Sequence, residues 1–141
     1  MIEELIESLH LEPHPEGGFY RQIYKSPMTV AQDERTRAAL TIIHFLLPAG
    51  QVSRWHRVTS DEVWTFLRGE PLRLYRLDGD VVLDENNPIH VVRAGEWQAA
   101  EPLGAYALVA CFVAPGFEFD DFAMMPEEIA AKLPEQLRRL V

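Results

Sequence analysis

Short runs of hydrophobic residues alternate with turn residues along most of this chain, a pattern typical of β-strands. From Phe19 onward, segments rich in Val, Ile, Leu, Phe, Tyr and Trp recur, separated by turn signals such as those at 48–50, 69–71 and 78–80. The pattern predicts strands at 19–25, 38–47, 51–58, 62–68, 71–77, 80–84, 88–93, 105–113 and 117–124. Many short strands at this spacing predict an all-β sandwich or barrel.

Both ends of the chain have a helical pattern instead. Hydrophobic residues recur at helical spacing over residues 2–9, which predicts a short amphipathic helix there. A second helical stretch begins after Pro126, and we expect Pro134 to kink or restart it. In the polar segment 26–37, hydrophobic residues recur with neither the strand nor the helix spacing, so we expect a mobile loop there.

Length and charge narrow the class of protein. The 141 residues are enough for one domain, which we expect to span residues 1–141, and the formal net charge is -9. This charge disfavours binding to nucleic acid or to an anionic membrane surface. The single cysteine, Cys111, cannot form an internal disulfide, and residues 1–9 lack the pattern of a signal peptide. We therefore expect a cytoplasmic protein.

The stretch 50–69 carries the clearest candidate chemistry. It is expected to form two strands joined by a turn at 59–61. Because side chains alternate between the two faces of a strand, His56 lies on one face of the first strand and Glu62 on one face of the second. If His56 points into a barrel, Glu62 can meet it across the hairpin. An imidazole beside a carboxylate can bind a metal or transfer protons. The alternative is a hydrogen-bonded pair with no chemical role.

The spacing in this stretch resembles the first motif of the cupin superfamily. In that motif five residues separate a glycine from a histidine, and a second histidine, a glutamate and a closing glycine follow. Gly50, His56, Glu62 and Gly69 fall in register with it, whereas the second histidine is replaced by Val58. The second cupin motif, around Gly95, keeps its glycine, but its histidine position is Gln98.

A closer resemblance covers most of the chain. The runs HPEGGFYR (14–21), SRWHRVTSDEVW (53–64), AGEWQAA (94–100) and APGFEFDDF (114–122) are similar to a family of small, largely uncharacterised cupins of bacteria, fungi and plants. The resemblance implies a double-stranded β-helix, or jelly-roll barrel, with a small-molecule pocket, a homodimer and no settled reaction. Members often have another histidine where this chain has Thr65.

The resemblance also bears on metal binding. Metal-binding cupins present three histidines and one glutamate, and only His56 and Glu62 carry over to this chain. A side-chain amide such as that of Gln98 is a poor ligand for zinc or iron. We therefore expect no cofactor and a metal-free pocket. A divalent metal, if one binds, would be held by His56, Glu62 and Gln98.

The N-terminal run 14–21 is similar in style to the corresponding element of dTDP-sugar epimerases, which are metal-free jelly-roll cupins. That similarity implies that His56 is a base, Glu62 its orienting partner, and Tyr20 or Tyr106 an acid. Arg21 or Arg54 would hold an anionic substrate. The other expected ligand-binding residues are His14, Glu16, His44, Trp64 and Gln98.

Three functions remain open from the sequence. The first is a metal-free cupin that binds a small metabolite, such as a sugar or carbonyl compound, as an isomerase or epimerase does. The second is a metal-dependent cupin enzyme. The third is a ligand-binding or sensor module without catalysis.

Overall fold

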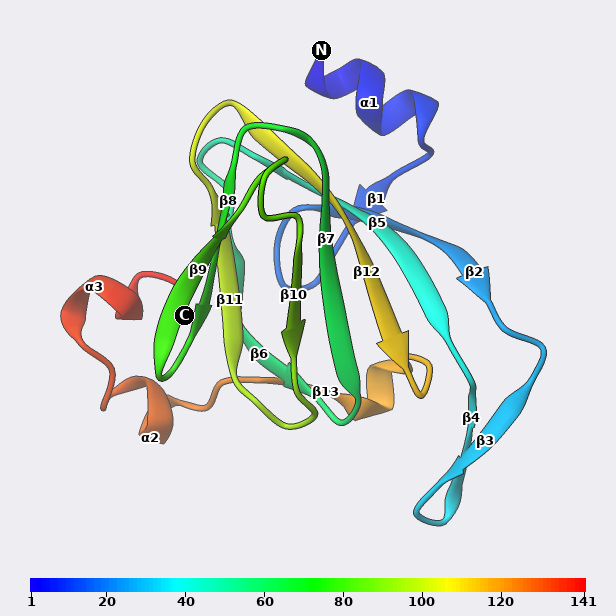
Figure 1. Cartoon of the computed structure of the whole chain (residues 1–141). Helices are drawn as coiled ribbons and strands as arrows, with labels where there is room; N and C mark the ends of the chain where they lie inside the picture. The colour runs from blue at the N-terminus through cyan, green and yellow to red at the C-terminus, as the bar shows by residue number, and fades with distance from the viewer.

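Two antiparallel sheets face each other in the computed structural model, which describes all 141 residues (Figure 1). In order, the first sheet contains β1 (Glu12–Pro13), β2 (Phe19–Lys25), β5 (Thr41–Pro48), β12 (Tyr106–Ala114), β7 (Asp61–Gly69) and β10 (Ile89–Val92). The second contains β13 (Phe122–Met124), β6 (Ser53–Val58), β11 (Gln98–Pro102), β8 (Leu72–Arg76) and β9 (Gly79–Leu83). The all-β prediction is confirmed.

The core lies between the two sheets. Phe45 and Trp64 enter it from the first sheet, and Leu72 and Leu74 enter from the second. Their neighbours in each strand face outward, as the alternation of side chains requires. Apolar burial between two sheets is the main stabilising contribution in such a fold.

Terminal helices cover the outer faces of the sheets. Helix α1 (Ile2–Ser8) packs Leu5 on the first sheet, at Leu46 and Leu108. On the second sheet, the C-terminal helices α2 (Glu127–Ala130) and α3 (Glu135–Arg138) pack on the outer face. This confirms the restart at Pro134. No helix has the length and apolar character needed to cross a membrane.

Trp55 and Trp97 lie in this outer cluster of the second sheet, together with Tyr75. The indole Nε1–H of Trp55 donates a hydrogen bond to the carbonyl oxygen of Leu137 at 2.9 Å. The side chain of Leu140 is fully buried in the same cluster. The C-terminal segment is therefore part of the packed fold and closes the back of the strand that carries His56.

Three expectations about secondary structure were wrong. Segment 26–37 is not an unstructured loop, because it contains the hairpin of β3 (Thr29–Gln32) and β4 (Arg35–Ala38). Both faces of this hairpin are largely exposed, so its sequence shows no alternation.

The other two errors concern β11 and the segment 117–124. Strand β11 went unpredicted because its residues, Gln-Ala-Ala-Glu-Pro, have low strand propensity. Segment 117–124 is not one strand, since it forms a loop, the short 3₁₀ helix η1 (Phe119–Asp121) and then β13. This non-strand conformation is what makes segment 117–122 available to the functional site.

Replacing Leu140 with alanine should destabilise the fold by about 2–4 kcal/mol, because it leaves a cavity under Trp55. Urea unfolding followed by tryptophan fluorescence measures this change in the free energy of unfolding. Val141→Ala is the matched control, since the neighbouring Val141 is 43% exposed, and should change stability by less than about 0.5 kcal/mol. Equal effects of the two substitutions would contradict a structural role for the C-terminal segment.

Candidate functional site

A cavity of about 420 Å³ opens between the two sheets. This volume is within the range of small-molecule sites. Its walls come from the N-terminal turn, strands β2, β5, β6, β7 and β12, and the segment 117–122. The lining residues are His14, Glu16, Tyr20, Gln22, Thr41, Ile43, His56, Val58, Glu62, Val113, Phe117, Glu118, Phe119, Asp120 and Phe122.

The polar centre of the cavity is a buried carboxyl between two imidazoles. Oε1 of Glu16 lies 3.4 Å from Nδ1 of His14, and Oε2 lies 3.3 Å from Nδ1 of His56. Gly17 adopts a φ of 116°, and a Cβ there would collide with the carbonyl oxygen of Val52. The glycine turn therefore brings the N-terminal run against the strand that carries His56.

Burial favours the uncharged forms of these three groups. It raises the pKa of Glu16 well above its ordinary value, and the nearby Glu62 carboxylate raises it further. The pKa of His14 is lowered to about 3, by burial and then by the charge of His56. The pKa of His56 is lowered to about 4 by burial, although its backbone hydrogen bond to Arg54 opposes the shift.

Backbone hydrogen bonds give the two imidazoles opposite tautomers. Nδ1 of His14 accepts the backbone N–H of Glu16 at 3.1 Å, which leaves the ring hydrogen on Nε2. Nδ1 of His56 lies 2.7 Å from the carbonyl oxygen of Arg54 and donates to it, which leaves the lone pair on Nε2. Because both rings line the cavity, it has one imidazole donor and one imidazole acceptor for a ligand.

The expected contact between His56 and Glu62 does not form. Instead, Nε2 of Gln98 donates to Oε1 of Glu62 at 2.8 Å, and the indole N–H of Trp64 donates to Oε1 of Gln98 at 2.7 Å. Burial raises the pKa of Glu62, whereas its hydrogen bonds to Gln98 and Cys111 lower it. Glu16 is therefore the carboxyl next to His56, and Gln98 and Trp64 support Glu62 from behind the cavity wall.

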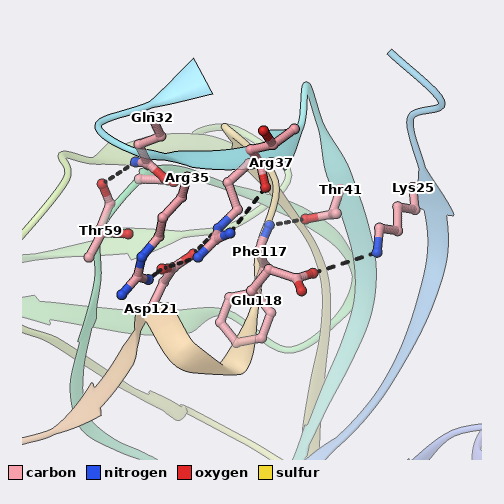
Figure 2. Close-up of polar contacts among 11 residues, drawn as sticks. Lys25, Gln32, Arg35, Arg37, Thr41, Thr59, Phe117, Glu118 and Asp121 are labelled. Carbon is pink, nitrogen blue, oxygen red and sulfur yellow. Dashed lines mark hydrogen bonds and ion pairs between the residues drawn. The ribbon is translucent and has the colours of Figure 1, made fainter. Parts of the chain in front are cut away.

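Ion pairs fix the outer wall of the cavity, segment 117–122, to the β3–β4 hairpin (Figure 2). Asp121 accepts from Arg37 at 2.7 and 2.9 Å and from Arg35 at 2.7 Å. Hydrogen bonding to Arg37 is the main reason why the pKa of Asp121 is lowered. The backbone N–H of Phe117 also donates to Oγ1 of Thr41 at 2.9 Å. These bonds hold the aromatic side chains of the segment over the cavity.

Six of the predicted site residues do not line the cavity, and two of them, Trp64 and Gln98, lie behind its wall as described above. Arg21 and His44 are paired neighbours on β2 and β5, next in sequence to lining residues and therefore on the opposite face. Tyr106 packs with the cluster under helix α1. Arg54 donates hydrogen bonds to the carbonyl oxygens of Pro15 and Glu16, so it positions the turn.

Tyr20 does line the cavity, and its ring contacts that of His14 edge-on at a centroid distance of 4.6 Å. Burial, with the charge of Glu12 and a hydrogen bond to it, raises the pKa of Tyr20. Glu12 is paired with Tyr20 across β1 and β2, so we assign the role of hydrogen-bond donor in the cavity to His14.

Sequence reasoning missed the contribution of segment 117–122, whose residues Phe117, Glu118, Phe119, Asp120 and Phe122 form one wall. The available signal was the run of alternating aromatic and acidic residues after Gly116. That alternation imitates a half-buried strand, which is how it was interpreted.

The buried imidazoles predict a pH dependence of stability. Since the unfolded chain protonates His56 near pH 6.5 and the folded chain only near 4, the favourable contribution of this residue is complete above pH 6.5 and is lost as the pH falls. The loss is on the order of 3 kcal/mol by about pH 4. The raised pKa of Glu16 acts in the opposite direction, because its contribution is lost as the pH rises.

Urea unfolding at several pH values between about 7 and 4 isolates the imidazole contribution if the protein is compared with its His56→Gln variant. The variant should lose less stability over this range than the unaltered protein. His10→Gln is the control, because His10 is exposed. Parallel pH profiles for the unaltered protein and His56→Gln would contradict a buried, uncharged His56.

Comparison with known proteins agrees with this architecture. Residues 3–125 match the cupin superfamily family DUF985. A hypothetical protein from Leishmania major is 28% identical, with a TM-score of 0.87 over 99% of this chain and 95% of that protein. A protein from Shewanella oneidensis is 35% identical, with a TM-score of 0.82 over 99% of this chain and 93% of that protein.

More distant structures share the fold alone. KdgF from a Halomonas species is 12% identical, with a TM-score of 0.61 over 78% of this chain and 89% of that protein. No curated protein sequence matches the chain. The family match spans most of the chain, and the two-sheet fold is shared with these structures. The chain therefore belongs to the DUF985 family of the cupin superfamily.

Proposed function

We propose that this cupin binds a small carbonyl or sugar-like metabolite and moves a proton on it, as isomerases and epimerases do. The observation that carries the proposal is the pair of buried imidazoles with opposite tautomers in one cavity. An acceptor and a donor side by side are what proton abstraction next to a carbonyl requires. A cytoplasmic location and a homodimer stay predictions.

The proposed chemistry begins at Nε2 of His56. This atom takes a proton from the substrate carbon next to the carbonyl, while Nε2–H of His14 donates a hydrogen bond to the carbonyl oxygen. The electron pair of the broken C–H bond forms the enolate, whose oxygen charge His14 stabilises. Return of the proton from His56 to the former carbonyl carbon, while the hydroxyl proton of the deprotonated carbon passes to the former carbonyl oxygen, completes the isomerisation of a hydroxy carbonyl compound.

Glu16 assists by its position beside His56. As His56 gains a proton it becomes a buried cation, and Oε2 of Glu16 lies 3.3 Å from its Nδ1. A carboxyl oxygen at this distance stabilises the imidazolium electrostatically. This is the role that the sequence assigned to Glu62.

The metal ligands implied by the cupin resemblance do not fit the residues of this cavity. Val58 lines the cavity without a donor atom, and both ends of the Gln98 amide are occupied, by Trp64 and by Glu62. No group of three or more His, Cys, Asp or Glu side chains is arranged to hold a metal ion. We therefore derive no step through a metal.

Proton abstraction can be tested before the substrate is known. A panel of aldoses, ketoses and amino sugars is incubated with the protein in D2O, and loss of the C–H signal next to the carbonyl is followed by NMR. At least one compound should exchange, and His56→Gln should slow the exchange by about 100-fold or more. His44→Gln, on the outward face of β5, should leave the rate unchanged.

Two results would contradict the proposal. One is an exchange rate that is the same in His56→Gln as in the unaltered protein. The other is binding of a panel compound, shown by a rise in Tm, without any exchange, which would favour the ligand-binding or sensor alternative.

The shortage of metal-ligating side chains in the cavity predicts the metal content of the purified protein. Protein without a histidine tag should contain less than about 0.1 equivalent of zinc, iron, nickel or manganese. The double variant Val58→His, Gln98→His restores the two missing imidazoles and should bind near one equivalent of zinc. The single variant Val58→His is its control. Near-stoichiometric metal in the unaltered protein would contradict the metal-free proposal.

A further inference from the structure

The ionisable side chains that line the cavity are unbalanced in charge. Four carry carboxyl groups, namely Glu16, Glu62, Glu118 and Asp120, and none is a lysine or arginine. The geometry points to a ligand with a positive charge, an ammonium-bearing small molecule such as an amino sugar or amino ketone. This inference rests on the proposed function and names the substrate class of the same site.

Each basic residue near the entrance has another partner. Arg35 and Arg37 pair with Asp121, which does not line the cavity. Lys25 pairs with Glu118 at 3.6 Å, and both side chains are about half exposed. Arg54 is hydrogen-bonded to backbone carbonyl oxygens. No cation is therefore left to receive an anionic ligand.

One carboxyl oxygen of the cavity wall, Oε2 of Glu16, accepts no hydrogen bond and lies 3.3 Å from Nδ1 of His56. Glu16 is 6% exposed, and its Oε2 is buried without a hydrogen bond. Leaving a buried acceptor unpaired costs free energy, and a charged carboxylate there costs more. A ligand ammonium group near Glu16 compensates that charge and lets the carboxyl ionise.

The outer wall is also suited to a cation. The rings of Phe117 and Phe119 meet edge to face at a centroid distance of 4.9 Å, and Phe122 lies 6.2 and 6.3 Å from them. Aromatic faces attract ammonium groups through their quadrupole. With Glu118 and Asp120 on the same segment, the wall combines aromatic and acidic groups.

The inferred cationic ligand differs from the expectation of an anionic substrate held by Arg21 or Arg54. Neither guanidinium lines the cavity. A phosphate, a sugar nucleotide or a keto acid would meet carboxyl groups without a compensating cation, which opposes binding. The same repulsion does not act on a neutral or cationic sugar.

The test uses pairs of probes that differ in charge and little in shape. Choline is paired with 3,3-dimethylbutan-1-ol, and D-glucosamine with D-glucose, with D-gluconate as an anionic probe. Calorimetric titration and thermal shift are carried out with EDTA present, so that contaminating metal plays no part. At least one cation should bind about tenfold or more tightly than its neutral partner.

Glu16→Gln should abolish that preference for the cation, whereas Glu7→Gln, on the exposed face of α1, should keep it. The comparison of paired probes on the unaltered protein remains decisive if Glu16→Gln does not fold. Equal affinity for both members of each pair, or tighter binding of gluconate, overturns the inference while the proposed function stands. Absence of binding by every probe at millimolar concentration overturns both.

Discussion

The burial of Glu16 between His14 and His56 is the constraint on which the site depends. Three ionisable groups share one water-poor space, and burial favours the uncharged form of all three, although the charge of Arg54 lowers the pKa of Glu16. The turn at Gly17 enforces this arrangement, because no other residue fits against Val52. Because charge is costly in this space, a charged ligand changes the protonation of the cluster.

The acidic side chains of segment 117–122 lie on both sides of the cavity wall. Asp121 faces the β3–β4 hairpin and binds Arg35 and Arg37, whereas its neighbour Asp120 lines the cavity. The 3₁₀ turn makes this possible, since adjacent acidic residues point in different directions there. The hairpin thereby fixes the wall while keeping both guanidinium groups out of the ligand's space.

The alternation of hydrophobic and polar residues was sufficient to predict most strands. It also placed His56 and Glu62 on inward faces, because successive side chains of a strand point to opposite faces of the sheet. It did not predict their partners. Gln98 reaches Glu62 from β11, a strand too weak in propensity to be recognised, and Glu16 reaches His56 through a turn. Asp121 pairs with Arg37, 84 residues away in sequence. Such contacts depend on how the sheets pack, which no local pattern contains.

The two departures from the cupin motif connect the missing metal ligands to the proposed cationic ligand. The resemblance implies a histidine at each of two positions. At the first, Val58 lines the cavity with an apolar side chain, and at the second, Gln98 donates an amide hydrogen. That hydrogen satisfies Glu62, the carboxyl that the motif retains, so Glu62 needs no cation. Oε2 of Glu16 accepts no such hydrogen bond, although Glu16 lines the same cavity. A positive group on the substrate can therefore provide the charge compensation that a metal ion provides in a four-ligand cupin site, and it would do so only while substrate is bound.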